Sequence, residues 1–413
     1  MTADAPRTFR ICHLGPETPG LSLTFVYREA AALKRRGHDV TVVSVRRPIH
    51  LATDADIGPV ATLYDEPKSA LVGSFVRAFA GDPAAFAATL ALAVRDVAAS
   101  AAQGRFAPAL LWHWFMGLHL ARLMVDRRIE HCHVHFAHFP AQIALYAGRY
   151  AGVPVTITAH ANDIHQAGLL LKEKGERAAA IATISEFNAD HLARRGVDRE
   201  KLPIVRCWAP LPSRRAPAPP ARPLRIGWLW RRVEKKGVAT AVRTVGILKE
   251  RGFDVVFEIV GDGPERARIE AAVASLGAGD VVKLLGAMPN SAAQSWLRSL
   301  HLFAMACQED RNGDVDGVPV AMMEAMAVGV PVASTRVSGV PELVIDGETG
   351  VLAPPEDPAA FADAIERCVR DAALYERLRR GAEARVATEF SEEVNVGRLE
   401  KLITDVQTRR ARP

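Results

Sequence analysis

The stretch that decides the fold lies in the second half of the chain, where LHLFAMA (300–306) leads into GDVDGVPVAMMEAMAVG (313–329) and then VPVAST (330–335). The first and last runs are short and apolar, as buried strands are, and the middle one becomes helical after Pro319. A strand, a helix and another strand in this order predict a parallel β-α-β unit. The helix must then cross one face of the sheet.

The same alternation of short apolar runs and amphipathic helices fills both halves of the chain. The other expected strands are FRICHLG (9–15), VTVVSV (40–45), HCHVHF (131–136), VPVTITAH (153–160), AAIATIS (179–185), LRIGWLW (224–230), VVFEIVG (255–261), VVKLLG (281–286) and GVLAPP (350–355). This pattern predicts an α/β protein of two doubly wound domains, each with a parallel sheet covered on both faces. Ligands of such sheets bind at the carboxyl ends of the strands.

A proline-rich stretch marks the domain boundary. The prolines of SRRAPAPPARP (213–223) resist regular structure and favour an extended connection. We therefore predict an N-terminal domain over 1–212, a linker over 213–223 and a C-terminal domain over 224–390. The last helix, 391–413, follows the final strand of the second domain and could pack back onto the first domain.

Charge and histidine are distributed unevenly between the halves. Residues 1–208 contain 24 Lys and Arg against 19 Asp and Glu, a difference of +5, whereas residues 209–413 contain 28 of each. Twelve of the 13 histidines also lie in the first part. The two domains are therefore expected to bind different ligands, the first one something anionic. An excess this small disfavours nucleic acid, which needs a concentrated basic face.

The cysteines and the apolar runs indicate the cellular compartment in which the protein works. The five cysteines form no C-x-x-C pair, which favours reduced thiols over a disulfide framework or a zinc site. The start, MTADAPRTFRICHLG, lacks a signal-peptide pattern. No run approaches the roughly 18 uninterrupted apolar residues of a membrane span. We expect a cytoplasmic protein that does not cross a membrane.

A first candidate site lies where the helix of the opening stretch begins. The backbone N–H groups near Val320 and Ala321, with the helix dipole, form a natural site for a diphosphate after the turn Gly317-Val318-Pro319. Asp316 precedes that turn, where a carboxylate can bind sugar hydroxyls. Glu324, about one and a half turns into the helix, could accept hydrogen bonds from two ribose hydroxyls. The two acids would bracket a nucleotide sugar.

Two cations follow a strand in WLWRRVEKKG (228–237). Arg231 and Lys236 could neutralise the charge that develops on a departing nucleotide, which is the work of a magnesium ion elsewhere. Asp314 and Asp316 have the D-x-D spacing of a metal-binding pair, but they lie in the loop before the helix and not at the end of a strand. We interpret that spacing as accidental and expect neither a metal nor another cofactor.

These motifs resemble the retaining glycosyltransferases of family 4, whose GT-B fold has two facing Rossmann-like domains with a cleft between them. The family pattern R-x4-K-G matches Arg231 and Lys236-Gly237, and the strand-end GDGP matches 261–264. The E-x7-E signature matches at Glu324, followed by EAMA-x-G-x-P-V and SGVPELV-x-DG-x-x-G. Asp316 replaces the first glutamate of that signature.

The resemblance implies a role for each matched residue. Glu324 would hold the ribose of the donor, Asp316 would contact the transferred sugar, and Arg231 and Lys236 would bind the diphosphate. The strand-end turn at Gly261 would contact the donor, and the stretch ending at Met288 would border its base. In this family retention is usually explained by attack on the front face, with the leaving phosphate taking the acceptor's proton. We therefore expect no general base and no covalent nucleophile.

The first half resembles the branch of the family that builds exopolysaccharides of the colanic acid type. The matching strings are LSLTFVYREAAALKRRGHDV (21–40), HVHFAHFPA (133–141) and TAHANDI (158–164). In that branch His160 would face the donor sugar across the cleft, with Asp163 close by and Ser22 as a further sugar or acceptor contact. The implied reaction transfers a hexose from a UDP- or GDP-sugar to a glycan or lipid-linked glycan at the inner membrane face.

Some of these features also have simpler explanations. The fragment at 261–266 lacks the third glycine of the dinucleotide fingerprint G-x-G-x-x-G, so a tight turn is preferred over an NAD site. His131, His133 and His135 would share one strand face and could bind zinc. No Cys or acidic partner spacing supports a metal, so we prefer a polar strand end lining the cleft. His160 could itself be a buried core histidine.

The segment 71–124 combines apolar residues with scattered arginines and tryptophans. It could rest on an anionic membrane or receive a lipid-linked acceptor, and helical core packing explains it equally well. Two other functions stay open. One is a GT-B epimerase or phosphorylase, although neither an acid/base pair nor a lysine for pyridoxal phosphate is identifiable. The other is an inactive partner subunit that binds a nucleotide sugar.

Overall fold

The computed structural model describes residues 7–20, 23–48, 56–211, 220–229, 234–261 and 266–411. The chain forms two compact units: unit 1 comprises residues 1–205 and 396–413, and unit 2 comprises residues 206–395. Most of the predicted linker, up to residue 219, lies outside the described residues.

The end of the chain belongs to unit 1. In helix α16 (Glu392–Ala411), Glu400 accepts hydrogen bonds from Arg36 at 2.7 Å and from His38 at 3.0 Å. Further along the helix, the Gln407 amide donates to the carbonyl oxygen of Glu130 at 2.7 Å. These contacts hold α16 against the turn after the first helix of the chain and against the residue that precedes the fourth strand.

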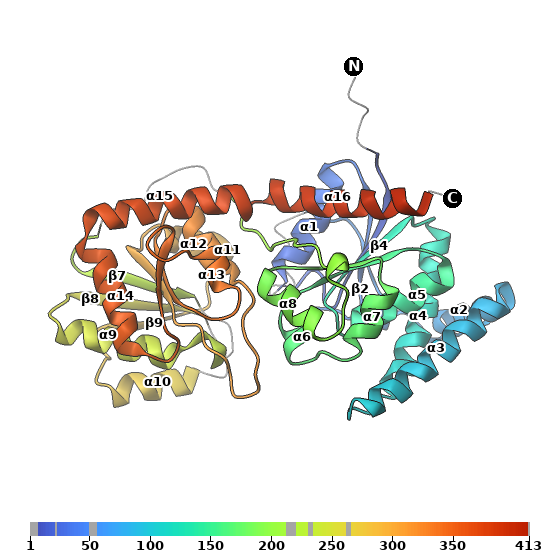
Figure 1. The fold of residues 1–413 in the computed structure, drawn as a ribbon, viewed down its shortest axis with the longest axis horizontal. Helices are drawn as coiled ribbons and strands as arrows, with labels where there is room; N and C mark the ends of the chain where they lie inside the picture. The colour runs from blue at the N-terminus through green and yellow to red at the C-terminus, as the bar shows by residue number, and fades with distance from the viewer. Residues whose placement is uncertain are drawn as a thin grey trace, which may run out of the picture. The chain divides into compact units, whose positions relative to one another are not determined.

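Unit 1 is built on a six-stranded parallel sheet (Figure 1). Its order is β3-β2-β1-β4-β5-β6, with β1 Arg10–Gly15, β2 Asp39–Ser44, β3 Val60–Thr62, β4 His131–His135, β5 Val155–Ala159 and β6 Ala180–Thr183. Its helices besides α16 include α1 Thr24–Arg35, α2 Lys68–Gly81, α3 Pro83–Ala102, α4 Ala109–Asp126, α5 Phe139–Ala151, α6 Asn162–His165, α7 Leu171–Arg177 and α8 Glu186–Arg194. The strand order reverses between β1 and β4.

The core of unit 1 joins aliphatic side chains from every part of the sheet, as expected for parallel strands covered on both faces. Ile11, Val43, Val134 and Ile157 all belong to this core. Histidine is the exception to the aliphatic pattern, because β4 (HCHVH) is buried along its whole length. The polar groups of that strand must therefore find partners inside the unit.

Three helices, and not one, connect β3 to β4. Only Asp82 separates α2 from α3, and its carboxylate caps α3 by accepting a hydrogen bond from the Ala85 amide at 2.9 Å. The two helices pack on α4 through a separate apolar cluster: Ala78, Phe86, Ala93, Trp114, Leu118 and Tyr146. This hairpin is therefore an addition to the doubly wound core.

Helix α3 is the one described helix long and apolar enough to cross a membrane, with a mean hydropathy of 1.4 over 18 residues of which 28% are buried. The sequence predicted no such segment, because Arg95 and Asp96 interrupt its apolar run. Asp96 is fully buried, pairs with Arg177 at 2.6 Å and accepts hydrogen bonds from Gln142 and Tyr146. These contacts tie α3 into unit 1, so its length and composition are weak grounds for a membrane span.

Unit 2 repeats the architecture. Its parallel sheet has the order β12-β11-β10-β7-β8-β9, with β7 Leu224–Leu229, β8 Val255–Val260, β9 Val282–Gly286, β10 Leu302–Met305, β11 Val332–Thr335 and β12 Gly350–Ala353. Its described helices include α9 Val238–Glu250, α10 Arg266–Ser275, α11 Asn290–Leu297, α12 Val320–Ala327, α13 Val340–Leu343, α14 Pro358–Arg370 and α15 Ala372–Glu389. The predicted fold class, two Rossmann-like doubly wound domains, is confirmed.

Candidate donor and sugar sites

Four of the residues predicted to bind a donor lie beyond the carboxyl ends of four neighbouring strands in unit 2. Lys236 follows β7, Gly261 follows β8, Met288 follows β9 and Asp316 follows β10. These strands are adjacent in the sheet, and the strand order reverses between β10 and β7. Doubly wound domains bind ligands at this kind of edge. The fold therefore gathers residues that are up to 80 positions apart, from 236 to 316, at one edge of the sheet.

Gly237 fixes where Lys236 lies. Its φ of +63° is in the left-handed region, and a Cβ added to it would lie 1.7 Å from the carbonyl oxygen of Ala306, which follows β10. The Gln308 amide also donates to the Lys235 carbonyl at 2.9 Å. The turn after β7 thus packs directly on the end of β10, and only glycine permits that approach.

We expect Gly237→Ala to destabilise unit 2 by more than about 2 kcal/mol, because the left-handed backbone alone costs a side chain about 1–2 kcal/mol and the clash with Ala306 adds to it. Gly252→Ala is the matched control: its φ is +81°, but no described heavy atom lies within 4 Å of the added Cβ. Calorimetry of both variants measures the difference. Equal losses in the two variants would show that the turn can move away from β10.

The two lysines of this turn meet two aspartates from the loop after β10. Lys236 Nζ lies 2.5 Å from Asp316 Oδ2, and Lys235 Nζ lies 2.8 Å from Asp314 Oδ2 and 3.5 Å from Asp316 Oδ1. All four side chains are at most 16% exposed. The D-x-D pair is therefore matched by two ammonium groups. The family pattern selected Lys236, but the sequence assigned no role to Lys235 and no partner to Asp314.

Charge balance in this cluster favours the ionised forms. Burial by itself would raise the pKa of Asp316, but Lys236 and Lys235 outweigh it and lower the pKa below its usual value. Burial likewise would lower the pKa of Lys235, and Asp316 and Asp314 raise it instead. Asp316 and Lys235 are therefore held in their charged forms by their neighbours. Cations that are already in place there can stabilise negative charge as it develops on a bound group, and no proton has to be transferred first.

Helix α12 begins directly after Pro319, as the sequence predicted. Proline has no side chain that can cap the helix, so Pro319 leaves the first-turn N–H groups at Val320 and Ala321 without a side-chain cap. Gly317, Val318 and Pro319 are buried beneath this end. Glu324, the fifth residue of the helix, is half-buried. The arrangement suits an anionic group at the helix start.

Several predicted site residues lie outside the described part of the chain. They are Arg231, the residues 262–264 of GDGP, and Ser22 of unit 1. Their roles stay predictions from the sequence. Of the glycine-rich fragment only Gly261 is described: its amide donates to the carbonyl of Gly286 at 2.8 Å, which links the ends of β8 and β9.

In unit 1 the structure corrects the place of Asp163. This carboxylate is fully buried and accepts hydrogen bonds from the backbone amides of Ala137 (2.6 Å) and His160 (3.1 Å). Burial raises its pKa to about 6, although these amides and Lys174 lower it. Asp163 therefore joins the segments that follow β4 and β5 and does not have the exposed position that a sugar contact needs.

His160 lies directly after β5 and is 7% exposed. Its ring is flanked by Phe25 and Phe136, with centroid distances of 4.7 and 4.5 Å. Phe136 has a φ of 72°, a left-handed conformation that costs a side chain about 1–2 kcal/mol. Burial and the neighbouring His135 hold the pKa of His160 well below its usual value. The imidazole is therefore neutral and rigidly placed.

The three histidines of β4, His131, His133 and His135, do not line a cleft as predicted, because all of them are fully buried inside unit 1. Their spacing along the chain indicated no acidic partner, yet the fold supplies Glu29 from α1. Glu29 Oε1 lies 3.0 Å from His13 Nε2, 2.9 Å from His135 Nε2 and 3.4 Å from His133 Nε2. Sequence reasoning missed Glu29, which looks like an ordinary helix acid.

Within the described part of the chain, these side chains include one group that could hold a metal. One ligand atom each from His13, Glu29 and His135 lies within 4.8 Å of the others. Imidazole and carboxylate groups are ordinary zinc ligands. Glu29 Oε1 lies 3.0 Å from His13 Nε2 and 2.9 Å from His135 Nε2, so these three atoms already form hydrogen bonds with one another, whereas His13 Nδ1 is buried with no hydrogen-bond partner among the described residues.

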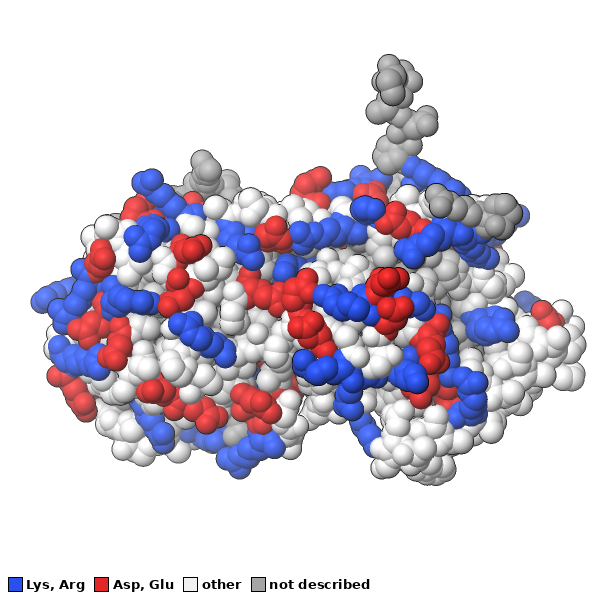
Figure 2. Space-filling view, viewed as in Figure 1, with Lys and Arg blue, Asp and Glu red and all other residues white. Residues whose placement is uncertain are grey.

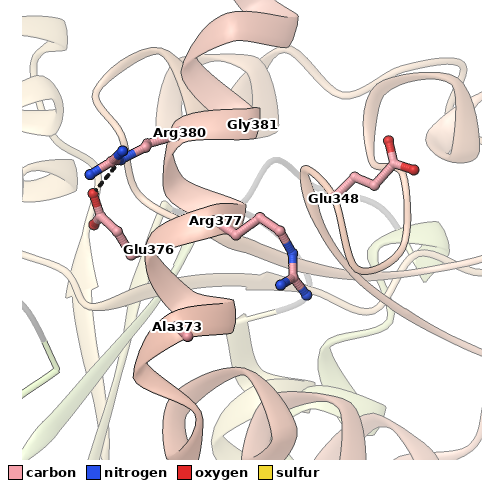
Figure 3. Close-up of a pocket in the computed structure, with 6 residues that line it drawn as sticks. All are labelled: Glu348, Ala373, Glu376, Arg377, Arg380 and Gly381. Atoms are coloured by element: carbon pink, nitrogen blue, oxygen red, sulfur yellow. Dashed lines mark hydrogen bonds and ion pairs between the residues drawn. The ribbon is translucent and has the colours of Figure 1, made fainter.

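A shallow pocket on unit 2 lies on different elements (Figure 3). It is lined by Ala373, Glu376, Arg377, Arg380 and Gly381 of α15 and by Glu348 of the turn before β12. Glu376 pairs with Arg380 at 2.7 Å, and Arg377 donates to the carbonyl of Gly347. None of the predicted donor residues lines it. The candidate donor site is therefore the carboxyl edge of the sheet and not this pocket.

The fold and the clustered residues define a chain of the GT-B glycosyltransferase class. HepE of Anabaena, solved in complex with UDP-glucose, superposes with a TM-score of 0.69 at 14% identity over 96% of this chain and 100% of that one. That likeness concerns the fold alone. Residues 223–371 match the model of glycosyl transferases group 1, and residues 23–211 match the model of glycosyltransferase family 4. The chain belongs to glycosyltransferase family 4.

Two curated relatives are similar over part of their length. WcaL of Escherichia coli (strain K12), named as a glycosyltransferase of colanic acid biosynthesis, is 36% identical over 192 residues, 46% of this chain and 47% of WcaL. AmsK of Erwinia amylovora, an amylovoran biosynthesis glycosyltransferase, is 36% identical over 182 residues, 44% of this chain and 45% of AmsK. The chain thus spans about half the length of these relatives.

Proposed function

We propose that this chain is a retaining, metal-independent hexosyltransferase that uses a UDP- or GDP-sugar in the synthesis of an exopolysaccharide or another cell-surface glycan. The observation that carries the proposal is the cluster of Lys236, Lys235 and Asp316 beside the uncapped start of α12. Cations and backbone N–H groups at one sheet edge suit a nucleotide diphosphate. The relatives named for polysaccharide biosynthesis support the same product class.

In this mechanism the protein itself stabilises the leaving group. Lys236, with Arg231, binds the diphosphate and neutralises the charge that appears as the sugar departs. Asp316 orients the sugar hydroxyls, Glu324 binds the ribose, and His160 of unit 1 contacts the transferred sugar. The acceptor oxygen attacks the face from which the nucleotide leaves, and the leaving phosphate takes the acceptor's proton. No protein residue has to act as a base.

A donor screen tests this proposal. Thermal shift and turnover are measured with UDP-, GDP-, ADP- and dTDP-sugars, with EDTA present throughout. We expect one donor to raise the melting temperature and to be hydrolysed slowly without an acceptor. Activity that disappears with EDTA and returns with a divalent cation would contradict metal independence. Inversion at the anomeric carbon, read by NMR of the first product, would contradict retention.

An inactive subunit that only binds a nucleotide sugar is the competing function. Asp316→Ala separates the two, because Asp316 should orient the transferred sugar while the diphosphate contacts remain. In an enzyme this variant keeps the donor-induced thermal shift and loses transfer. In a binding subunit the wild-type chain shows no transfer, and Asp316→Ala alters neither the donor-induced thermal shift nor this lack of transfer.

We further propose that the protein works on the cytoplasmic face of an anionic membrane and that α2 and α3 contact the lipid. Val72, Val76 and Phe79 of α2 recur at helical spacing and are 56%, 56% and 57% exposed. Val94 of α3 and Phe106, which follows α3, are also exposed, and these five side chains are called the α2–α3 face below. Figure 2 shows this end of unit 1 as a largely white surface with few charged side chains. Exposed apolar groups of this size mark interaction surfaces.

The charges beside this face have the sign that a membrane requires. Between residues 68 and 105 the exposed bases are Lys68, Arg77, Arg95 and Arg105, against one exposed acid, Asp82. Apolar side chains bordered by bases bind to anionic bilayers, where each base near the surface contributes about 1 kcal/mol. A lipid-linked acceptor would be presented on the same surface.

We expect Phe79→Glu to weaken binding to vesicles containing phosphatidylglycerol by about tenfold or more, since it removes an inserting ring and adds a repelled charge. Co-sedimentation of the protein with vesicles measures this. Val125→Glu, at a residue of α4 that is also 57% exposed, is the control and should bind normally. Equal binding to pure phosphatidylcholine, or an equal loss in the control, would overturn the proposed surface.

A further inference from the structure

Lys174 of α7 is a buried cation that forms no ion pair with any described carboxylate. The residue is 3% exposed, and its ammonium group donates a hydrogen bond to the carbonyl oxygen of Leu169 at 2.6 Å. Burial lowers its pKa to about 8, although Asp163, Asp96 and Glu173 raise it from a longer distance. Lys174 therefore stays charged at neutral pH, and a buried charge without a paired anion is costly.

Two imidazoles near Lys174 each keep a nitrogen unused. His113 of α4 and His138, which precedes α5, are half-buried, and in both rings Nδ1 is buried with no hydrogen-bond partner among the described residues. Burial, together with the positive charges of Lys174 and Arg46, lowers the pKa of each ring to about 4. Both rings are therefore neutral at pH 7 and can each donate one N–H, and the charges that act on them are positive.

The ring of Phe139 brings these groups together. Its centroid lies 4.7 Å from that of His138 and 6.2 Å from that of His113, and the guanidinium carbon of Arg46 lies 4.9 Å from it. Arg46 follows β2 and His138 follows β4, the two strands on either side of β1. The groups thus lie at the carboxyl edge of the sheet, beside the reversal of strand order, where doubly wound domains bind ligands.

Aromatic side chains lead from Arg46 to α2, the helix that carries much of the α2–α3 face. Arg46 lies 5.7 Å from the ring of Tyr64, and Tyr64 meets Trp112 of α4 edge-on at 6.0 Å. Trp112 stacks on Phe115 at 5.4 Å, and Phe115 lies 5.9 Å from Phe75 of α2. Arg46 is exposed and Trp112 is 46% exposed, so this part of unit 1 is accessible from solvent.

We propose that unit 1 contains a phosphate-binding subsite for the acceptor, the basic cluster, made of Arg46, His113, His138 and Lys174. The two cations supply charge and the two neutral imidazoles supply N–H donors, which together match the several oxygens of a phosphate group. The inference rests on the proposed function for the nature of the ligand, the phosphate that joins the lipid of an acceptor to its sugar. A lipid on the α2–α3 face would carry that phosphate toward the basic cluster.

NMR of the full chain labelled with ¹⁵N-histidine tests for the subsite with inorganic phosphate as the probe. The chain carries Lys236→Ala, which weakens the candidate donor site of unit 2, and His113→Asn and His138→Asn assign the two signals. We expect phosphate to shift both signals saturably and acetate at equal ionic strength to leave them unchanged. No saturable shift at either histidine, or equal shifts with acetate, would overturn the proposal.

Variants of two neighbouring arginines locate the charge. Arg46→Gln should weaken phosphate binding about tenfold or more, the usual effect of losing one charge-assisted contact. Arg47→Gln is the matched control, because this arginine is 77% exposed and pairs with Asp65 at 2.8 Å, and it should bind phosphate normally. Equal losses in the two variants would show diffuse surface charge and overturn the subsite. Lys174→Met should abolish binding, and if it does not fold, the two arginine variants decide.

A transfer assay distinguishes a lipid-borne phosphate from a soluble one. With an active donor and a sugar on a prenyl phosphate in vesicles, Arg46→Gln should raise KM for the acceptor about tenfold and leave KM for the donor unchanged. Inorganic phosphate should compete with this acceptor. A soluble sugar phosphate that reacts with the same KM as the prenyl phosphate would overturn the lipid as the source.

The two measurements also separate this inference from the proposed function. If no nucleotide sugar reacts but phosphate shifts His113 and His138 and depends on Arg46, the proposed function fails and the subsite stands. If transfer proceeds with an unchanged KM for the acceptor in Arg46→Gln, and phosphate moves neither histidine signal, the inference fails and the proposed function stands.

Discussion

Acidification to about pH 5 is expected to unfold unit 1 while unit 2 stays folded. The reason is the set of buried, neutral histidines in unit 1. Burial lowers the pKa of His131 to about 3 and those of His113 and His138 to about 4, and it also lowers the pKa values of His13, His133 and His160. In unit 2 the single histidine is His301.

The sign follows from proton uptake. These groups titrate near 6.5 when unfolded but resist protonation when folded, so stability is fully present above pH 6.5 and is lost as the pH falls. By pH 5 each such histidine costs about 2 kcal/mol, and His131, His113 and His138 together cost about 6 kcal/mol. The whole free energy of unfolding of a domain is only about 5–15 kcal/mol. Asp163, with a folded pKa of about 6, opposes this trend but offsets only about 1.4 kcal/mol by pH 5, less than the cost of one histidine.

Calorimetry between pH 8 and pH 5 measures the effect, and hydrogen exchange read by mass spectrometry assigns each transition to a unit. The transition of unit 1 should move to lower temperature much faster than that of unit 2, which serves as the internal control. Parallel shifts of the two transitions, or earlier loss of unit 2, would show that the buried histidines are already protonated in the folded state.

Lys236→Ala is expected to lower kcat for sugar transfer about 10²–10³-fold, the usual effect of removing one group that stabilises developing charge. Lys236 is the cation that the turn at Gly237 holds against Asp316, 2.5 Å away. Because Lys235 also contacts Asp316, the carboxylate keeps a neutralising partner and the fold should survive. Steady-state kinetics with the donor found in the screen, with thermal unfolding alongside, measure both effects.

Two further variants separate catalysis from stability. Lys249→Ala removes a lysine whose ion pair with Asp280 is exposed, and it should change neither kcat nor the melting temperature measurably. Lys235→Ala breaks the buried pair with Asp314 and should mainly lower the melting temperature. Normal turnover in Lys236→Ala would show that this lysine has no part in the mechanism, and it would argue against the whole cluster as the diphosphate site.

Much of the fold could be predicted because it depends on local signals. The runs RICHLG, VTVV and VFEIV form β1, β2 and β8 where their apolar character indicated them, and Pro319 stands directly before α12. The positions of the candidate donor residues could be predicted for the same reason, because each of them follows a strand. The sequence did not decide whether the apolar residues of α2 and α3 lie on the surface or in the core. The exposure of one face of a helix depends on which elements pack against its opposite face.

By itself, the sequence determined the two parallel sheets, the family and the strand ends that carry Lys236, Gly261, Met288 and Asp316. Only the tertiary structure decided that Lys235 pairs with Asp314, that Asp163 binds backbone amides, and that Glu29 meets His135 across 106 positions. The physical reason is the distance along the chain over which each kind of interaction acts. Strand and helix signals arise from periodicity over a few residues, whereas a buried ion pair depends on strand order and on the space left between packed side chains, which no spacing along the chain encodes.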